Sequence, residues 1–427
     1  MSAPAGPPRP PGGAHPVNAP YVPSATLFLW WLGQPAQPRW VGTLAMVQAS
    51  KGVSLRYAPS WLRHGFALSE DLPLLDQEWL PEQREAVAGA VDDARPDRWG
   101  ERVIRFIDKP PRLALLDYLF FAGDERFGAL GVSTSPDVYM PRPFGPLPAL
   151  GDLATIDELV RQVQAGQPVQ PALQRLIAPG ATLGGARPKA LISLDGHPWV
   201  LKFSELGEAL DMPLIEHATM TLAAKAGITP AETRPLPLPG GRHAVAVRRF
   251  DRAPGQRVHA LSAFVALRAA GEAMGYPELA QLLRRRGALA EGRSTADRRE
   301  LFRRMVFNIL IDNTDDHEKN HALLMNDAGD YLLSPAFDVL PSGQALGYQQ
   351  MRVGRDMADS TLANAMSEAA AFGLKVKEAA AEARRVAAVV DGWQAHFRAA
   401  GVRAGDVALL AEQIDREHLR QQRQVAA

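Results

Sequence analysis

A short polar segment near residue 315 carries the residue types that phosphoryl transfer needs. Asp315 and Asn320 stand five positions apart in this segment, and Asp338 lies further along the chain, directly after Phe337. Phosphoryl transfer requires metal ions held against the phosphates, a cation on the non-transferred phosphates, and a carboxylate that orients the acceptor hydroxyl. We therefore predict that Asp315 is a catalytic carboxylate and that Asn320 and Asp338 are metal ligands.

The cation is predicted to come from a strand upstream. Lys202 ends an apolar run that follows a Gly-rich turn, and Glu216 lies on the next predicted helix. A strand Lys paired with a helix Glu is half of a protein-kinase nucleotide site, and Asp315 and Asn320 have the spacing of a kinase catalytic loop. The order of these signals along the chain is more informative than any single residue.

The Gly-rich turn alone is a weak signal for phosphate binding. Gly180 and Gly185 have the spacing of the Walker glycines, but Ala186 stands where that motif has its lysine. Gly184, Gly185 and Ala186 are nevertheless the candidate nucleotide contacts of this turn.

Apolar periodicity predicts an α+β chain. Strands are expected at 27–31, 41–44, 53–57 and 243–250, a hairpin over 189–203, and helices over 82–91, 111–121, 212–226 and 301–310. From about residue 259 the chain is predicted to be helical to its end, interrupted by the polar loop 313–320 and a second hairpin. The basic residues Arg248, Arg249 and Arg252 are interpreted as a solvated cluster.

A chain of 427 residues is expected to form two or three packing units. The first 23 residues hold eight prolines and three glycines, which predicts a disordered tail. Units are expected over 24–150, 151–255 and 256–427, with the Pro-rich stretch 136–148 as a linker.

Composition excludes several classes of function. Lys plus Arg and Asp plus Glu both total 47, so the chain has no global basic field for nucleic acid or anionic membranes. The absence of cysteine excludes disulfides, thiol nucleophiles and Cys-ligated metals, and it agrees with a reducing cytoplasm. Because no apolar run approaches the ~20 residues that span a bilayer, we expect no membrane segment.

Several segments together resemble the HipA family of toxin kinases. The matching blocks are 184–189, 200–203, 249–252, 313–320 and 337–340, with 41–44, 96–100 and 127–131 nearer the N-terminus. The resemblance runs from about residue 25 to the C-terminal helices. It implies a two-lobed, protein-kinase-like α+β fold with a mixed α/β N-terminal lobe and a mostly helical C-terminal lobe.

The resemblance also implies roles for single residues. Lys202 would contact the nucleotide phosphates, Phe250 would lie at the hinge near the adenine, and Asp315 would be the catalytic base. Asn320 and Asp338 would bind Mg²⁺. The implied cofactors are ATP and Mg²⁺.

The family further implies a Ser/Thr protein substrate, in some members an aminoacyl-tRNA synthetase. It also implies a small, HipB-like DNA-binding antitoxin that makes most of the DNA contact. Two positions depart from the family pattern: Arg248 stands where an acidic hinge residue is expected, and Thr182 stands where members carry an autophosphorylated serine. Thr182 is therefore a candidate autophosphorylation site.

Two alternatives remain open. Residues 317–321 match the H-E-x-x-H pattern of zinc metalloproteases, which requires a regular helix through the motif. The second alternative is a kinase-like chain without turnover that serves only as antitoxin partner or corepressor.

Overall fold

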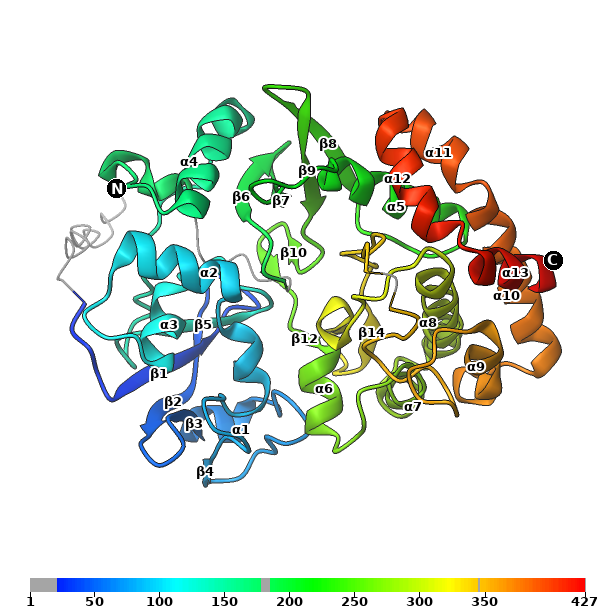
Figure 1. The fold of residues 1–427 in the computed structure, drawn as a ribbon. Helices are drawn as coiled ribbons and strands as arrows, with labels where there is room; N and C mark the ends of the chain where they lie inside the picture. The colour runs from blue at the N-terminus through cyan, green and yellow to red at the C-terminus, as the bar shows by residue number, and fades with distance from the viewer. Residues whose placement is uncertain (1–20, 178–184, 345, 427) are drawn as a thin grey trace, which may run out of the picture.

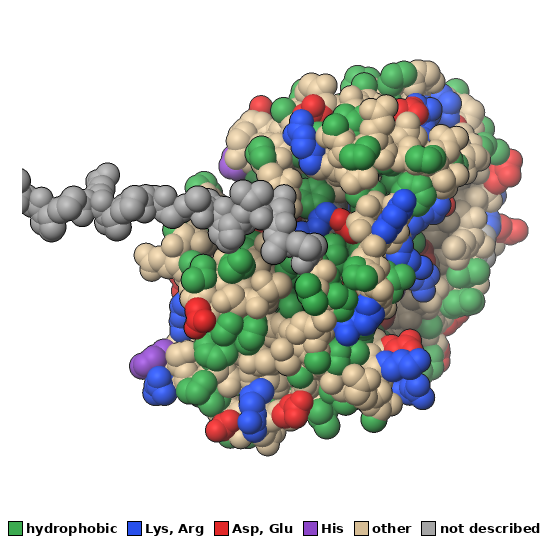
Figure 2. Space-filling model, turned by 90° about the vertical axis from the view of Figure 1, so that its left-hand side faces the viewer, with side chains coloured by type: hydrophobic (Ala, Val, Ile, Leu, Met, Phe, Trp, Pro, Cys, Tyr) green, Lys and Arg blue, Asp and Glu red, His purple; other side chains and the backbone are tan. Residues whose placement is uncertain are grey.

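The computed structural model describes residues 21–177, 185–344 and 346–426. The N-terminal sheet lies at the left of Figure 1, a smaller sheet lies near the top, and helices fill the right-hand side. Figure 2 looks from the side of the N-terminal sheet and shows Lys and Arg interspersed with Asp and Glu. Within the described residues, no helix combines the length and apolar character needed to cross a bilayer.

The N-terminal unit, residues 26–133, is built on an antiparallel sheet of order β4-β3-β2-β1-β5. Alternate residues of its strands point into the core, as at Leu27 and Leu29, because successive strand side chains face opposite sides. Its elements are β1 (Thr26–Trp31), β2 (Arg39–Val47), β3 (Gly52–Tyr57), α1 (Pro59–His64), β4 (Glu78–Trp79), α2 (Arg98–Val103), α3 (Leu115–Phe121) and β5 (Leu130–Ser133).

The prediction of a helix over 82–91 is wrong. Residues 86–88 instead run beside β3, where the Val53 amide donates to the Ala86 carbonyl and the Ala88 amide donates to the Val53 carbonyl, both at 3.0 Å. Only a 3₁₀ helix, Gly89–Ala94, follows. Pairing with β3 satisfies the backbone groups that a helix would have used. The helix expected over 111–121 is shorter than predicted and begins at Leu115.

The small lobe is an antiparallel sheet of order β6-β7-β9-β8 that is covered on both faces. The predicted hairpin is confirmed, and its turn residues Asp195 and Gly196 both have positive φ, as a two-residue hairpin turn requires. One face packs with α4 and the other with α5. The elements are α4 (Leu153–Ala165), β6 (Lys189–Leu194), β7 (His197–Lys202), α5 (Met212–Lys225), β8 (Thr233–Leu238) and β9 (Arg242–Arg248).

The helical lobe, residues 260–426, surrounds the buried helix α8 (Arg293–Leu310), as the apolar stripe at 301–310 predicted. The described residues between Leu333 and Leu362 form no helix, so the interruption is longer than expected. The strands β10 (Arg252–Ala253) and β11 (Gln256–Arg257) precede this lobe. Its other elements are β12 (Ala260–Ser262), α6 (Ala263–Ala269), α7 (Tyr276–Arg286), β13 (Ala322–Met325), β14 (Tyr331–Leu333), α9 (Leu362–Ser367), α10 (Val376–Asp391), α11 (Trp393–Ala399), α12 (Ala404–Ile414) and α13 (Glu417–Ala426).

Candidate active site

Lys202 forms the centre of the candidate site. At the end of β7, its Nζ lies 2.7 Å from Glu216 Oε1 on α5 and 2.6 Å from Asp338 Oδ1. Lys202 is 5% exposed and Glu216 is 2% exposed. Three residues far apart in the sequence therefore meet in one buried ion-pair network.

The charges of this network shift the titration of its carboxyls. Burial raises the pKa of Glu216, and the Lys202 ammonium offsets that effect only in part. Burial would also raise the pKa of Asp338, but the hydrogen-bonded Lys202 brings it below its usual value. Asp338 has a φ of +58°, a left-handed conformation that is uncommon for a non-Gly residue and often occurs at functional sites.

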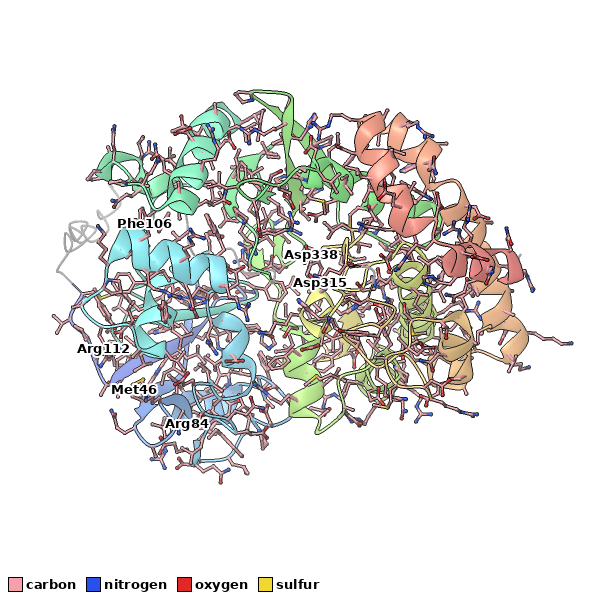
Figure 3. The ribbon with its side chains drawn as sticks, in the orientation of Figure 1. Met46, Arg84, Phe106, Arg112, Asp315 and Asp338 are labelled. Carbon is pink, nitrogen blue, oxygen red and sulfur yellow. The ribbon has the colours of Figure 1, made fainter. Side chains whose placement is uncertain are left out.

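Asp315 and Asp338 lie near each other in the middle of the molecule, between the N-terminal unit and the helical lobe (Figure 3). The Asp315 side chain is exposed. Desolvation raises the pKa of Asp315, His317 lowers it, and the Asp338 carboxylate raises it. Asp315 makes no side-chain hydrogen bond or ion pair with a described residue, so its carboxylate can accept a bond from a ligand.

Asn320 has an unsatisfied acceptor that fits a hard cation. The residue is 4% exposed, and its Oδ1 atom is buried without a hydrogen-bond partner among the described residues. Mg²⁺ is commonly held by one or two protein oxygen ligands together with substrate phosphates. No group of three or more His, Asp or Glu residues with the geometry of a metal site occurs in the described ranges. The amide of Asn320 and the carboxylate of Asp338 suit such a cation.

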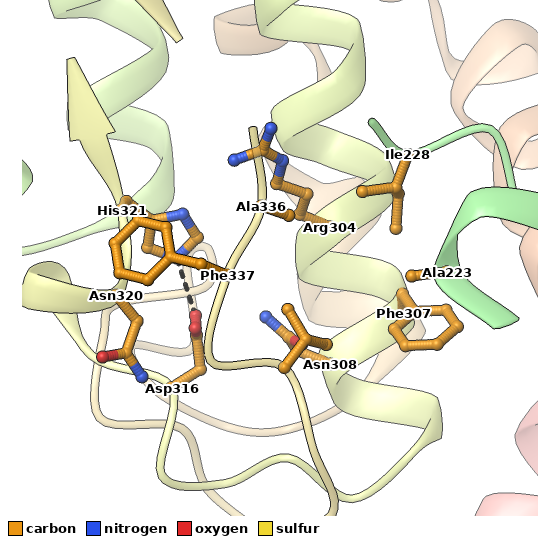
Figure 4. Close-up of a pocket in the computed structure, with 11 residues that line it drawn as sticks. Ala223, Ile228, Arg304, Phe307, Asn308, Asp316, Asn320, His321, Ala336 and Phe337 are labelled. Atoms are coloured by element: carbon orange, nitrogen blue, oxygen red, sulfur yellow. Dashed lines mark hydrogen bonds and ion pairs between the residues drawn. The ribbon is translucent and has the colours of Figure 1, made fainter. Parts of the chain in front are cut away.

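Asp316, to which the sequence assigned no role, anchors the polar loop 313–320 by its side chain, and Figure 4 shows its interaction with His321. Its Oδ2 accepts a hydrogen bond from the Tyr276 hydroxyl and lies 2.8 Å from His321 Nε2. Asn308 Nδ2 donates to the same Tyr276 oxygen at 3.3 Å. Asp316 is 1% exposed, so these bonds fix the backbone next to Asp315. Sequence reasoning had only the adjacent acidic residues as a signal.

The arrangement of residues 317–321 contradicts the zinc-protease alternative. Residues Glu318–Asn320 form a single 3₁₀ turn, and His321 follows in an extended conformation. His321 Nε2 is engaged with Asp316, whereas His317 lines the open groove beside Asp315. The two imidazoles therefore do not share the face of a regular helix, which that chemistry needs.

The end of the Gly-rich turn faces Asp338. Gly185 has a φ of +91°, and a Cβ at this position would lie 3.7 Å from Lys189 Nζ and 4.0 Å from Asp338 Oδ2. Glycine thus keeps this space open, and the neighbouring Ala186 is exposed. The predicted residues Thr182 and Gly184 lie outside the described residues.

Phe250 packs against the segment that carries Asp338. Its ring centroid lies 5.4 Å from that of Phe337 and 6.1 Å from that of Phe127 in the N-terminal unit. The aromatic contact brings the end of the small lobe to the candidate site.

The interpretation of the basic residues as a solvated cluster is wrong for Arg249 and Arg252. Arg249 is 4% exposed, and the Arg252 side chain is 8% exposed. Both guanidinium groups pair with the buried carboxylate of Asp251 at 2.7 Å. Only Arg248 remains near the surface, where it pairs with Glu232 at 3.1 Å.

An open groove of about 630 Å³ runs beside the polar loop 313–320. Asp93, Asp97 and Arg98 of the N-terminal unit line one side, and Asp315 and Lys319 line another. The N-terminal unit thus forms part of the wall around the candidate base.

Comparison with known proteins places the chain in a family. A model of the HipA-like C-terminal domain matches residues 181–393, and a model of the HipA N-terminal domain matches residues 36–133. Together these matches cover most of the chain. The chain belongs to the HipA family. The expectation from the sequence blocks is therefore confirmed.

Individual relatives agree with this assignment. The protein Y4dM of Sinorhizobium fredii (strain NBRC 101917 / NGR234), named as a candidate kinase, is 33% identical over 156 residues, which are 34% of this chain and 37% of that protein. This chain therefore spans little more than a third of that relative's length.

Of two solved structures compared with this chain, one matches nearly its whole length. A chain of the HipA, HipB and operator DNA complex of the Shewanella oneidensis MR-1 toxin antitoxin system matches with a TM-score of 0.60 and 17% identity, covering 94% of this chain and 96% of that one. The Helicobacter pylori proinflammatory kinase CtkA matches with a TM-score of 0.43 and 13% identity, covering 57% of this chain and 92% of that chain. The likeness to the HipA chain, over nearly the whole length, confirms the expected two-lobed, kinase-like α+β fold.

Proposed function

We propose that this chain is an ATP-dependent Ser/Thr protein kinase that acts as the toxin of a toxin–antitoxin pair. The observation that carries the proposal is the contact of Lys202 with both Glu216 and Asp338, next to Asp315. Membership of the HipA family supports the proposal further, because a HipA chain of the same kinase-like fold matches this chain over nearly its whole length.

Metal binding and activation of the acceptor hydroxyl would fall to different residues. Asn320 Oδ1 and the Asp338 carboxylate would hold Mg²⁺, and Mg²⁺-ATP, when bound, supplies the phosphoryl group. Asp315, exposed in the groove, would orient the acceptor hydroxyl and accept its proton. The raised pKa of Asp315 favours this proton transfer, because a more basic carboxylate binds the proton more strongly.

The small lobe would bind the nucleotide. The Lys202 ammonium would contact the non-transferred phosphates, and Glu216 would keep it in place. The Gly184–Ala186 turn would cover the phosphates, and Phe250 would lie near the adenine at the hinge.

We further propose a protein target and a protein partner. The target would be a translation-related protein such as an aminoacyl-tRNA synthetase, modified on Ser or Thr. The partner would be a small HipB-like antitoxin that makes most of the DNA contact, in keeping with equal totals of 47 basic and 47 acidic residues. The similar Shewanella HipA was solved with HipB and operator DNA.

Asp315→Asn and Asp338→Ala test the catalytic assignment. We expect each to reduce phosphoryl transfer by ~10² or more while the circular dichroism spectrum stays that of the folded wild type. Asp327→Asn, on an exposed hairpin turn, is the matched control and should keep full activity. Phosphoproteomics after controlled expression, compared with Asp315→Asn, would identify the target.

The same preparations decide between the proposal and its alternatives. Wild-type-like transfer by folded Asp315→Asn would contradict the kinase assignment, and a wild-type chain that consumes no ATP would favour the non-catalytic partner. Elemental analysis should find no stoichiometric zinc. Intact mass and peptide mapping after incubation with Mg²⁺-ATP would show whether Thr182 is phosphorylated, which we propose as a means to switch the enzyme off.

A further inference from the structure

Asp97 reaches from the N-terminal unit to the base of the Gly-rich turn. Its Oδ2 lies 2.5 Å from Lys189 Nζ, and the two side chains are 10% and 3% exposed. The Lys189 ammonium also donates to the Gly185 carbonyl at 3.2 Å. Trp99, two residues after Asp97, donates from its indole to the Lys189 carbonyl at 2.7 Å. The N-terminal unit thus holds both the side chain and the backbone of Lys189.

Lys189 lies where a small displacement would reach the nucleotide site. It is the first residue of β6 and stands opposite Lys202 in the sheet. Lys189 Nζ and Asp338 Oδ2 both border the space that Gly185 leaves open. The positive charge of Lys189 also contributes to the low pKa of Asp338.

We propose that Asp97 is a positioning residue for the nucleotide site. By holding Lys189, it keeps the end of the Gly-rich turn at Gly185 in the conformation that accepts ATP phosphates. This inference rests on the proposed kinase function. Without the Asp97 charge, Lys189 would turn toward the Asp338 carboxylate and compete with Lys202 and the metal for it.

Energetics favour a positioning role over simple stabilisation. Removing two charges from water costs free energy that their attraction often fails to offset, so a buried ion pair is weak support for stability alone. Here the pair joins Asp97 and Lys189, which lie 92 positions apart in the chain. Asp97 also lines the groove that contains Asp315. The N-terminal unit would therefore determine the geometry of the nucleotide site.

Asp97 also has a local role in α2, and the test must distinguish this role from its contact with Lys189. It is the N-cap of α2 and accepts a hydrogen bond from the Gly100 amide at 2.8 Å. Asn caps a helix about as well as Asp, so Asp97→Asn keeps the cap and removes only the charge. Asp152→Asn is the matched control, because Asp152 accepts a similar bond from the Ala149 amide and has no ion pair with a described residue.

Two measurements on the full chain test the inference. The first is hydrogen–deuterium exchange of residues 185–194 without nucleotide, and the second is calorimetric titration with ATP and Mg²⁺. In Asp97→Asn we expect faster exchange there and an ATP Kd raised roughly 10-fold, as for the loss of a charge-assisted hydrogen bond. Asp152→Asn should match wild type in both.

A double variant sharpens the result. If Asp97 acts through Lys189, Asp97→Asn adds little to the effect of Lys189→Met on ATP affinity, whereas independent sites would add. Unchanged exchange, unchanged ATP affinity or additive effects would each overturn the inference. If wild type binds no ATP, the proposed function fails, and the exchange data still decide whether Asp97 holds residues 185–194.

Discussion

The Asp251 carboxylate accepts a hydrogen bond of 2.8 Å from the backbone amide of Gly128, 123 positions earlier in the chain. The same carboxylate pairs with Arg249 and Arg252, whose guanidinium groups also donate to the Arg126 carbonyl at 2.9 and 2.7 Å. These hydrogen bonds and ion pairs join two sequence blocks of the family, 127–131 and 249–252. In this arrangement Phe127 packs against Phe250.

Asp251→Asn should strongly destabilise the fold. Burial opposes ionisation of Asp251, but Arg249 and Arg252 hold its pKa well below the usual range. Removing the negative charge leaves the two buried guanidinium groups with the more distant Glu125 carboxylate, at 3.3 and 3.8 Å, so the free energy of unfolding should fall by about 3 kcal/mol. Urea denaturation measures the loss, with the exposed Asp137→Asn as control. A loss below about 1 kcal/mol would mean that water or other groups already satisfy the guanidiniums.

Lys202→Met should weaken ATP binding more than Glu216→Gln does. The Met variant leaves Glu216 and Asp338 without their shared cation, so unfolding should also become easier by about 3 kcal/mol. Glu216→Gln keeps an oxygen acceptor for Lys202 and leaves its pair with Asp338 intact. Calorimetric titration with Mg²⁺-ATP checks the order, and Lys377→Met, an exposed change on α10, should leave affinity as in wild type. The opposite order would show that Glu216 itself governs the site.

Asp316→Asn should slow transfer through the loop rather than through ATP binding. Tyr276 and His321 both bind the same oxygen, Oδ2, and the neutral amide oxygen of Asn is a weaker acceptor than the carboxylate. Both buried hydrogen bonds should therefore weaken, at a cost of about 2 kcal/mol. We expect a lower kcat with a nearly unchanged KM for ATP, and a lower melting temperature. Tyr276→Phe removes only one of the two hydrogen bonds to Asp316, together with the long 3.3 Å bond from Asn308, so its effect should be smaller. Equal effects of the two changes would argue against this account.

His259 should make the fold sensitive to acid. Burial lowers its pKa to about 4, while an unfolded chain titrates near ~6.5. The unfolded state therefore binds a proton that the folded state does not bind between these values, so stability is complete above about pH 6.5 and falls as pH drops toward 4. Protonation would disturb a ring that packs on Trp31 and Phe66 and bonds to the Leu68 carbonyl at 2.9 Å.

The difference between wild type and His259→Phe isolates this group. From pH 7.5 to 4.5 the free energy of unfolding of wild type should fall by about 2.5 kcal/mol more than that of His259→Phe. Asp93 acts in the opposite direction: burial raises its pKa to about 6, so its contribution grows as pH falls, and it is common to both proteins. Urea denaturation at each pH measures the two curves. Parallel curves would contradict the assignment to His259.

Local patterns in the sequence correctly predicted the parts of the fold that depend on near neighbours. The hairpin over 189–203 follows from two apolar runs around Asp195 and Gly196, and α8 follows from a stripe of apolar residues with helical spacing. The order of Lys202, Glu216, Asp315, Asn320 and Asp338 along the chain was also readable, because each residue sits in a short motif with its own spacing. The sequence did not predict whether these residues lie close together in the folded chain.

Only the tertiary structure decided which charges are buried and what they face. Arg249 was interpreted as part of a solvated cluster, and Asp97 was given no role of its own. In the structure Arg249 is buried with Asp251, and Asp97 pairs with Lys189, which packing brings from 92 positions away. Residues 86–88 likewise form no helix, since β3 offers their backbone another set of hydrogen bonds. Local sequence fixes periodicity and turns over a few residues, whereas contacts across 90 or more positions depend on how whole elements pack.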